Sequence, residues 1–106
     1  MVYAGNILYD KTLLESDKKF IVFGAGICGR KILMYLEWNG VKDNVICFCD
    51  SYIKSKKDIA GIPVLSVIDV CEQYPNLDYL IGGKYEREMY DILRKRAISK
   101  IHLLML

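Results

Sequence analysis

Apolar and polar residues alternate along this chain in blocks that predict strands and helices in turn. The run Phe20–Phe23 consists of aromatic and β-branched residues and is too short for a helix, so it predicts a buried strand. From Cys28 to Leu36 the apolar residues recur at helical spacing, and Asn39-Gly40 then supplies a suitable C-terminal cap. The continuous apolar run 45–49 is typical of a parallel strand that is buried on both faces.

The second half continues this alternation after a polar, lysine-rich stretch, 51–61, that is expected to be a loop. Residues 62–65 predict a short strand, and Pro63 assigns it to an edge of the sheet because proline cannot donate a ladder hydrogen bond. Ser66, with Asp69 three residues later, resembles a capped helix start. Further patterns predict a strand over 77–81, a helix over 85–93 and a last strand over 101–104. The order β-α-β-β-α-β-α-β predicts a three-layer, Rossmann-like α/β fold whose five-stranded parallel sheet has the strand order 3-2-1-4-5.

Residues 19–106 are expected to form this single domain, and residues 1–18 a separate N-terminal segment. The apolar residues of the segment, among them Ile7 and Leu14, have a loosely helical spacing that is consistent with a short helix. No apolar stretch reaches the roughly 18 residues of a membrane span and no signal peptide opens the chain, so we expect a cytoplasmic protein. A net charge of +2 gives no argument for nucleic-acid binding.

A glycine triplet, Gly24-x-Gly26-x-x-Gly29, joins the first strand to the first helix. In a dinucleotide-binding turn the first glycine permits a tight turn, the second lets the backbone approach a pyrophosphate, and the third lets the helix pack on the strand. The helix N-terminus would then aim its free N–H groups at the phosphates. Asp50 ends the next strand about 20 residues further on, where this motif has an acidic residue. The alternative is a glycine turn that only packs a helix onto a sheet.

In a doubly wound sheet the ligand lies beyond the carboxyl ends of the strands, where the strand order reverses. This rule selects Gly24, Ala25, Gly26, Ile27, Cys28, Gly29, Arg30, Asp50, Ser51, Gly82, Gly83 and Lys84 as candidate binding residues. Asp50 is expected to accept hydrogen bonds from a ribose hydroxyl and to oppose a 2′-phosphate, which favours NAD over NADP; Lys54 and Lys56 weaken that preference. Arg30 either reaches a phosphate or is simply solvated. Gly82-Gly83 either lets the backbone approach the ligand or forms a strand-to-helix turn.

The other chemically active side chains give weaker signals. Cys47, Cys49 and Cys71 lack metal-ligand spacing and are expected to be small buried residues. Cys28 lies where the first helix begins, and a helix N-terminus lowers the pKa of a thiol, so Cys28 is either reactive or a packing residue. His102, the only histidine, falls in the last predicted strand and is expected to be structural.

Three stretches of the sequence together resemble a known group of domains. They are IVFGAGICGRKIL, CFCDSYIKSKKDIAGIPVLSVID and YLIGGKYEREMYDILRKRAISKIHLL. Residues 19–104 resemble the Rossmann-like N-terminal domain of bacterial sugar acetyltransferases and of membrane-associated nucleotide-sugar dehydratases and epimerases. The resemblance implies a nucleotide ligand, NAD(P) or a UDP-sugar, in surface polysaccharide biosynthesis, bound at the glycine turn and Asp50. Such proteins continue into a catalytic part, so a catalytic domain or subunit is the expected partner.

The sequence supports three functional hypotheses. The first, which we prefer, is a nucleotide-binding domain that presents NAD(H) or a UDP-sugar to an enzyme and has no complete active site of its own. The second is an oxidoreductase of the nucleotide-sugar dehydrogenase or epimerase type, which completes its active site by forming a homo-oligomer. The third is a redox- or ligand-sensing interaction module that works through Cys28 or the N-terminal segment.

Overall fold

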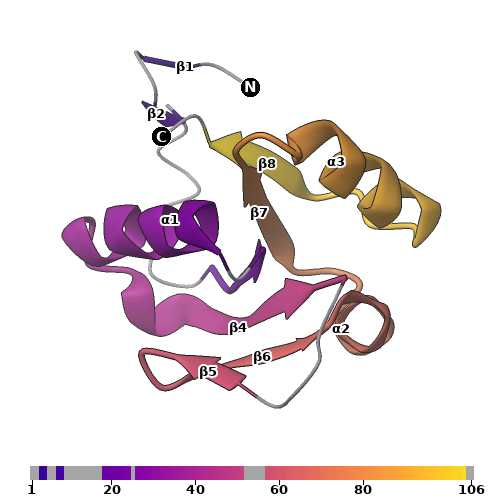
Figure 1. The fold of residues 1–106 in the computed structure, drawn as a ribbon, viewed down its shortest axis with the longest axis horizontal. Helices are drawn as coiled ribbons and strands as arrows, with labels where there is room; N and C mark the ends of the chain where they lie inside the picture. Colours follow the sequence, from indigo (N-terminus) through magenta and orange to yellow (C-terminus); the bar gives the residue numbers. More distant parts are fainter. Residues whose placement is uncertain (1–2, 5–6, 9–17, 25, 52–56, 105–106) are drawn as a thin grey trace.

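The computed structural model describes residues 3–4, 7–8, 18–24, 26–51 and 57–104, and these form an α/β fold. One mixed sheet is covered by α1 on one face and by α2 and α3 on the other (Figure 1). The strands are β1 (Tyr3–Ala4), β2 (Ile7–Leu8), β3 (Phe20–Phe23), β4 (Val45–Asp50), β5 (Lys57–Ile59), β6 (Ile62–Ser66), β7 (Asp78–Gly82) and β8 (Ile101–Leu104). The helices are α1 (Ile27–Trp38), the short 3-10 helix η2 (Lys42–Asn44), α2 (Val67–Gln73) and α3 (Glu86–Lys95).

The main sheet differs from the predicted five-stranded parallel sheet of order 3-2-1-4-5. It has six strands in the order β5-β6-β4-β3-β7-β8. The pairs β6-β4, β4-β3, β3-β7 and β7-β8 are parallel, whereas β5 pairs with β6 in the antiparallel direction. The prediction was wrong in strand count, and therefore in the order of the whole sheet, because it placed the residues of β5 in a loop. The five strands that it included lie in the predicted relative order, β6-β4-β3-β7-β8.

The additional strand β5 is one arm of a tight hairpin with β6. Ile59 pairs with Ile62, and the two residues between them, Ala60 and Gly61, have φ angles of 52° and 80°. Positive φ at both central residues is the geometry of a two-residue hairpin turn, which usually carries asparagine or aspartate followed by glycine. Because β5 covers β6, the expectation that Pro63 marks an edge strand is also wrong. Pro63 lies opposite Asp58, one residue before the pairing of β6 with β4 begins at Val64.

Alternate residues of the central strands supply two separate apolar cores. On the α1 face, Phe20 and Val22 of β3 pack with Ile32, Leu33 and Leu36 of the helix. On the opposite face the core is built by the other residues of the same strands together with α2 and α3: Ile21, Phe23, Cys47, Cys49, Val67, Val70, Cys71, Tyr79, Ile81, Leu93 and Ile98. A sheet covered on both faces explains why its strands are continuous apolar runs.

The predicted helix ends are confirmed in two places. At the end of α1, Gly40 has φ +75°, and the N–H groups of Gly40 and Val41 donate to the carbonyls of Glu37 and Leu36. This is the glycine-terminated cap expected from Asn39-Gly40. At the start of α2, the Ser66 hydroxyl accepts a hydrogen bond of 3.2 Å from the N–H of Asp69.

The N-terminal segment contains a small second sheet. Tyr3–Ala4 and Ile7–Leu8 pair in the antiparallel direction, and β2 lies close to β8 (Figure 1). The backbone of these four residues is extended rather than helical as expected; the remainder of the segment up to residue 17 lies outside the described residues. Within the described part of the chain, none of the helices is long and apolar enough to cross a membrane.

The end of α3 leads to a test of backbone strain. Ala97 occupies the same capping position as Gly40, with φ +63°, and the N–H of Ile98 donates to the Leu93 carbonyl. A left-handed conformation is unfavourable for a residue with a Cβ atom, so Ala97→Gly should raise the free energy of unfolding by about 0.5–1 kcal/mol. The matched variant Gly40→Ala should lower it by about 1 kcal/mol. Urea unfolding measures both, and a shift of the same sign in the two variants would contradict this account.

Candidate functional site

A cleft of about 650 Å³ opens at the carboxyl ends of the central strands. The end of β3 and the glycine turn form its base, the end of β4 forms one side, and the start of α3 forms the other. Its walls are formed by Phe23, Gly24, Gly26, Ile27, Cys28, Gly29, Asp50, Ser51, Gly82, Lys84, Tyr85, Glu88, Met89 and Ile92. The cleft therefore combines residues from three strand ends that lie far apart in the sequence.

Two glycines of the turn are required by the fold itself. Gly24 has φ +104°, and its N–H donates a 2.7 Å hydrogen bond to the Cys49 carbonyl, which ties the turn to the end of β4. A Cβ atom on Gly29 would collide with the Gly24 carbonyl oxygen, so only glycine lets α1 pack this closely on the turn. These are the geometries that the sequence predicted for the first and third glycines of the motif.

Gly26 differs from both because the fold does not require a glycine there. Its φ of −90° and ψ of −155° are open to any residue, and a Cβ atom built on it would meet no heavy atom of the described residues within 4 Å, its chain neighbours aside. Gly26 also lines the cleft. Because Gly26 has no side chain, the cleft has free space directly in front of the N-terminus of α1.

The N-terminus of α1 has no side-chain cap. Gly26 is the N-cap residue and makes no side-chain hydrogen bond, and no acidic residue lies in the first turn. In contrast, α2 is capped by Ser66 and carries Asp69, and α3 carries Glu86 and Glu88 in its first turn. Because the first N–H groups of a helix have no intrahelical acceptor, α1 presents donors and the positive end of its dipole toward the cleft.

Charged and apolar side chains are divided between the walls of the cleft. Asp50, half-buried at the end of β4, lies on one side, and Lys84 and Glu88 lie at the start of α3 on the other. The Lys84 ammonium lies 5.7 Å from the centroid of the exposed Tyr85 ring, within the range of a cation–π contact. Met89 and Ile92 of α3 complete an apolar wall.

The structure brings most of the predicted binding residues together. Of the twelve, nine line the cleft: Gly24, Gly26, Ile27, Cys28, Gly29, Asp50, Ser51, Gly82 and Lys84. Ala25 lies outside the described residues. Arg30 is exposed on α1 and does not line the cleft. Sequence reasoning missed the wall from α3, since Tyr85, Met89 and Ile92 have the same helical spacing as residues that face only the core.

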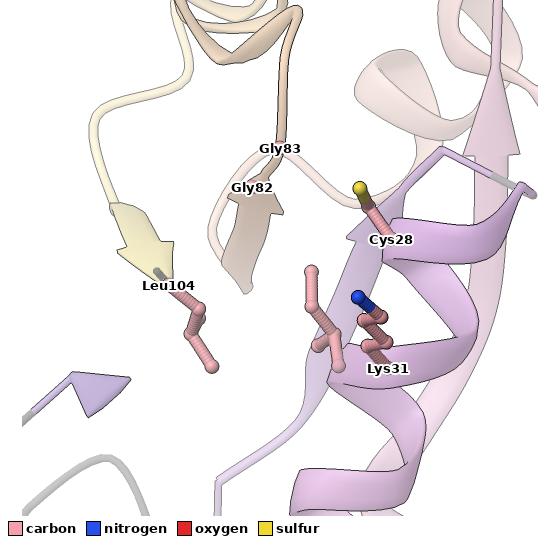
Figure 2. Close-up of a pocket in the computed structure, with 6 residues that line it drawn as sticks. Cys28, Lys31, Gly82, Gly83 and Leu104 are labelled. Atoms are coloured by element: carbon pink, nitrogen blue, oxygen red, sulfur yellow. The ribbon is translucent and has the colours of Figure 1, made fainter. Parts of the chain in front are cut away.

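Gly83, the remaining candidate, lies beside the cleft rather than in it. It has φ +93°, and a Cβ atom there would collide with the Cys28 side chain. Figure 2 shows Cys28 and Lys31 on α1 facing the end of β7, where Gly82 and Gly83 lie next to Leu104 of β8. These residues and Ile32 enclose a second, much smaller pocket. Gly83 thus serves as a strand-to-helix turn that leaves room for Cys28.

The three other cysteines are buried, and His102 is partly buried. Cys47, Cys49 and Cys71 all belong to the core between the sheet and helices α2 and α3, and burial raises the pKa of each thiol, that of Cys47 to about 11. The Nε2 atom of His102 lies 2.9 Å from Oδ1 of the buried Asp78, across the β7-β8 pair. Among the described residues no group of three or more His, Cys, Asp or Glu side chains is arranged to hold a metal ion.

Comparisons with known proteins do not assign the chain to a family. No protein-family model matches the chain, and a search of curated proteins finds no significant match. The site is therefore interpreted from its own residues.

The burial of the cysteines predicts a simple pattern of thiol reactivity. Cys28 is exposed at the cleft, whereas the other three thiols are buried and their pKa values are raised. In the native protein a disulfide reagent such as DTNB should modify Cys28 at least about 100-fold faster than the rest, because only thiolates that solvent can reach react. Absorbance at 412 nm follows the reaction. Cys28→Ser should abolish the fast phase; a fast phase that persists in this variant would contradict the assignment.

Proposed function

We propose that this chain is a nucleotide-binding domain that takes a ligand with a diphosphate group, NAD(H) or a UDP-sugar, and that has no complete active site of its own. The observation that carries the proposal is Gly26. The fold requires Gly24 and Gly29, but nothing in the part of the fold that the structure describes requires a glycine at position 26, where a side chain would fill space in the cleft. Close approach of a diphosphate to the backbone supplies a reason for that glycine.

The N-terminus of α1 supports the same ligand. Its N-cap residue Gly26 offers no side-chain acceptor, its first turn carries no acidic residue, and this turn lines the cleft. A diphosphate would accept hydrogen bonds from the first N–H groups of this helix and would interact favourably with the helix dipole. The ligand would thus take the place of the side-chain cap that Ser66 gives to α2.

The remaining walls fit the two ends of a nucleotide. Asp50 follows Cys49 at the end of β4, and the Cys49 carbonyl holds the glycine turn, so the Asp50 carboxylate would accept hydrogen bonds from ribose hydroxyls. Met89 and Ile92 offer an apolar surface for a base or a nicotinamide ring. Among the described residues that line the cleft, Asp50 and Glu88 carry two negative charges and Lys84 carries one positive charge, a balance that would disfavour an additional 2′-phosphate.

The biological setting follows from the sequence resemblance alone. A domain of this kind in a surface-polysaccharide pathway would present NAD(H) or a nucleotide sugar to a catalytic domain or subunit.

A panel of NAD, NADP, UDP, UDP-N-acetylglucosamine and coenzyme A distinguishes these ligands in a thermal-shift experiment. A ligand at 100 times its dissociation constant adds about 2.7 kcal/mol of stability, which is a shift on the order of 10 °C in a domain of this size. Stabilisation by none of the panel would overturn the proposal.

Substitution of Gly26 separates binding from folding. Gly26→Ser introduces a good N-cap residue, so the free energy of unfolding should stay within about 0.5 kcal/mol of the parent or rise slightly. The hydroxyl would compete with a diphosphate for the same N–H groups and fill the same space, so affinity should fall at least about ten-fold; the larger Gly26→Val should reduce it further. Isothermal titration calorimetry with the ligand selected by the panel measures both.

Ser99→Val is the matched control, because Ser99 is exposed and precedes β8, at the opposite end of the strands from the cleft. Its affinity should equal that of the parent. Normal binding by Gly26→Val would show that the glycine turn is not the diphosphate site.

A further inference from the structure

The outer side of α1 carries a stripe of exposed apolar residues. Ile27, Met34 and Trp38 are 75%, 52% and 80% exposed, and their spacing places them on one side of the helix. The opposite side, with Ile32, Leu33 and Leu36, is buried against the sheet, so the helix is apolar on two sides. We call Ile27, Met34 and Trp38 the outer stripe. Met34 and Trp38 lie one turn apart, and Ile27 lies two turns before Met34, with the exposed Lys31 on the turn between. Large exposed apolar residues gathered on one side of a helix mark an interaction surface.

The outer stripe is open to a large partner. Among the described residues, α1 is the helix that covers its face of the sheet, whereas α2 and α3 lie together on the other face (Figure 1). A second helix can therefore approach α1 along its whole length without displacing a neighbouring helix. At 1.5 Å per residue the helix offers a contact line about 18 Å long.

We propose that the outer stripe binds a second copy of this chain, with the two α1 helices packed antiparallel about a twofold axis. In a self-complementary pair of this kind Ile27 lies opposite Trp38 of the second copy, and Met34 lies near the centre. Trp38 of each copy then covers Ile27 of the other copy. Trp38 is the largest exposed side chain of the helix, and both copies of it become buried in one interface.

The charges beside the outer stripe favour this occupant and this direction. Arg30 and Glu37 are both exposed and lie seven residues apart on the same flank of α1, and Glu37 also forms an ion pair of 3.4 Å with Lys42 of its own chain. In the antiparallel pair the same flank of each helix lies on the same side, and Glu37 of the second copy falls about 3 Å along the axis from Arg30. Two symmetric ion pairs result. In a parallel pair the same flank of the two helices would lie on opposite sides of the contact, so Arg30 meets Glu37 of the second copy only in the antiparallel direction.

The pairing also brings the second copy to the cleft. Ile27 belongs both to the outer stripe and to the wall of the cleft. Trp38 of the second copy, packed on Ile27, would therefore stand at the rim of the cleft and extend its apolar wall. This consequence rests on the proposed nucleotide site, whereas the self-association does not, and the experiment below contains no nucleotide.

The area of the contact sets the expected strength. One helix face is smaller than the roughly 800 Å² per partner of a stable interface, so the dissociation constant should lie at micromolar to submillimolar concentration. Sedimentation velocity from 5 to 500 µM should show a monomer that converts to a dimer. Trp38 is the only tryptophan of the chain, so its emission should shift to shorter wavelength over the same range. Trp38→Lys and Met34→Lys should each weaken the dimer at least ten-fold.

Charge reversal tests the direction of packing. Arg30→Glu and Glu37→Arg should each weaken self-association about five-fold or more, because each replaces two attractive pairs by two repulsive ones. When the two variants are mixed, the acidic flank of one chain meets the basic flank of the other, and heterodimers should form with about the parent affinity. Loss of folding cannot produce this rescue, and far-ultraviolet circular dichroism of each variant provides a check.

Tyr90→Lys is the matched control, since Tyr90 is an aromatic residue of α3, 46% exposed and outside the outer stripe. It should leave the dimer unchanged. A protein that stays monomeric at 500 µM would overturn the proposal. So would a monomer whose tryptophan emission is blue-shifted at every concentration, because that result indicates a cover from within the same chain. Equal association of the single charge variants and their mixture would overturn the antiparallel arrangement.

Discussion

The close approach of Gly29 to the carbonyl oxygen of Gly24 is the constraint on which the rest of the structure depends. With no side chain between them, α1 begins directly above the end of β3 and then runs back across the sheet. That path buries Ile32 and Leu36 in the core beneath α1, while the Gly24 N–H bond to Cys49 brings the end of β4, and with it Asp50, to the same place. The packing of the core and the assembly of the cleft thus both depend on the contact between Gly29 and the Gly24 carbonyl oxygen.

Local signals of the sequence were sufficient for most elements of the fold, because the chemistry that ends a helix is itself local. Ser66 caps α2 and Gly40 ends α1 through hydrogen bonds to residues within one or two turns. Strand β5 lacked such a signal. Its turn uses Ala60 where asparagine or aspartate is usual, and an antiparallel edge strand has no continuous apolar run. The edge-strand prediction from Pro63 was wrong because a proline shows only that its position lacks a backbone N–H donor. It does not show that the strand lies at the edge of the sheet.

The candidate site was predictable where it depends on strand ends and not where it depends on helix faces. Carboxyl ends of parallel strands converge whatever their side chains, so Gly24, Asp50 and Gly82 meet in the cleft. Met89 and Ile92 are apolar residues of a helix, and their spacing is the same whether they contact the core or a ligand. Both are partly buried on the core and also line the cleft, a double role that periodicity cannot separate.

Helical spacing also does not tell whether an apolar residue of α1 packs on the sheet or on a partner, and the outer stripe is an example of this. The outer stripe also links the proposed dimer to the proposed nucleotide site. A helix that is apolar on two sides needs two partners, and the sheet is only one of them. Because Ile27 lies both in the outer stripe and at the cleft, a nucleotide and a second copy would meet across one side chain. Binding free energies coupled in this way are reciprocal: a ligand that contacts Trp38 of the second copy must strengthen the dimer by the factor by which the dimer strengthens its binding. A small interface that is weak alone would then respond to the ligand, and α1, fixed at Gly29, would be the element through which both equilibria act.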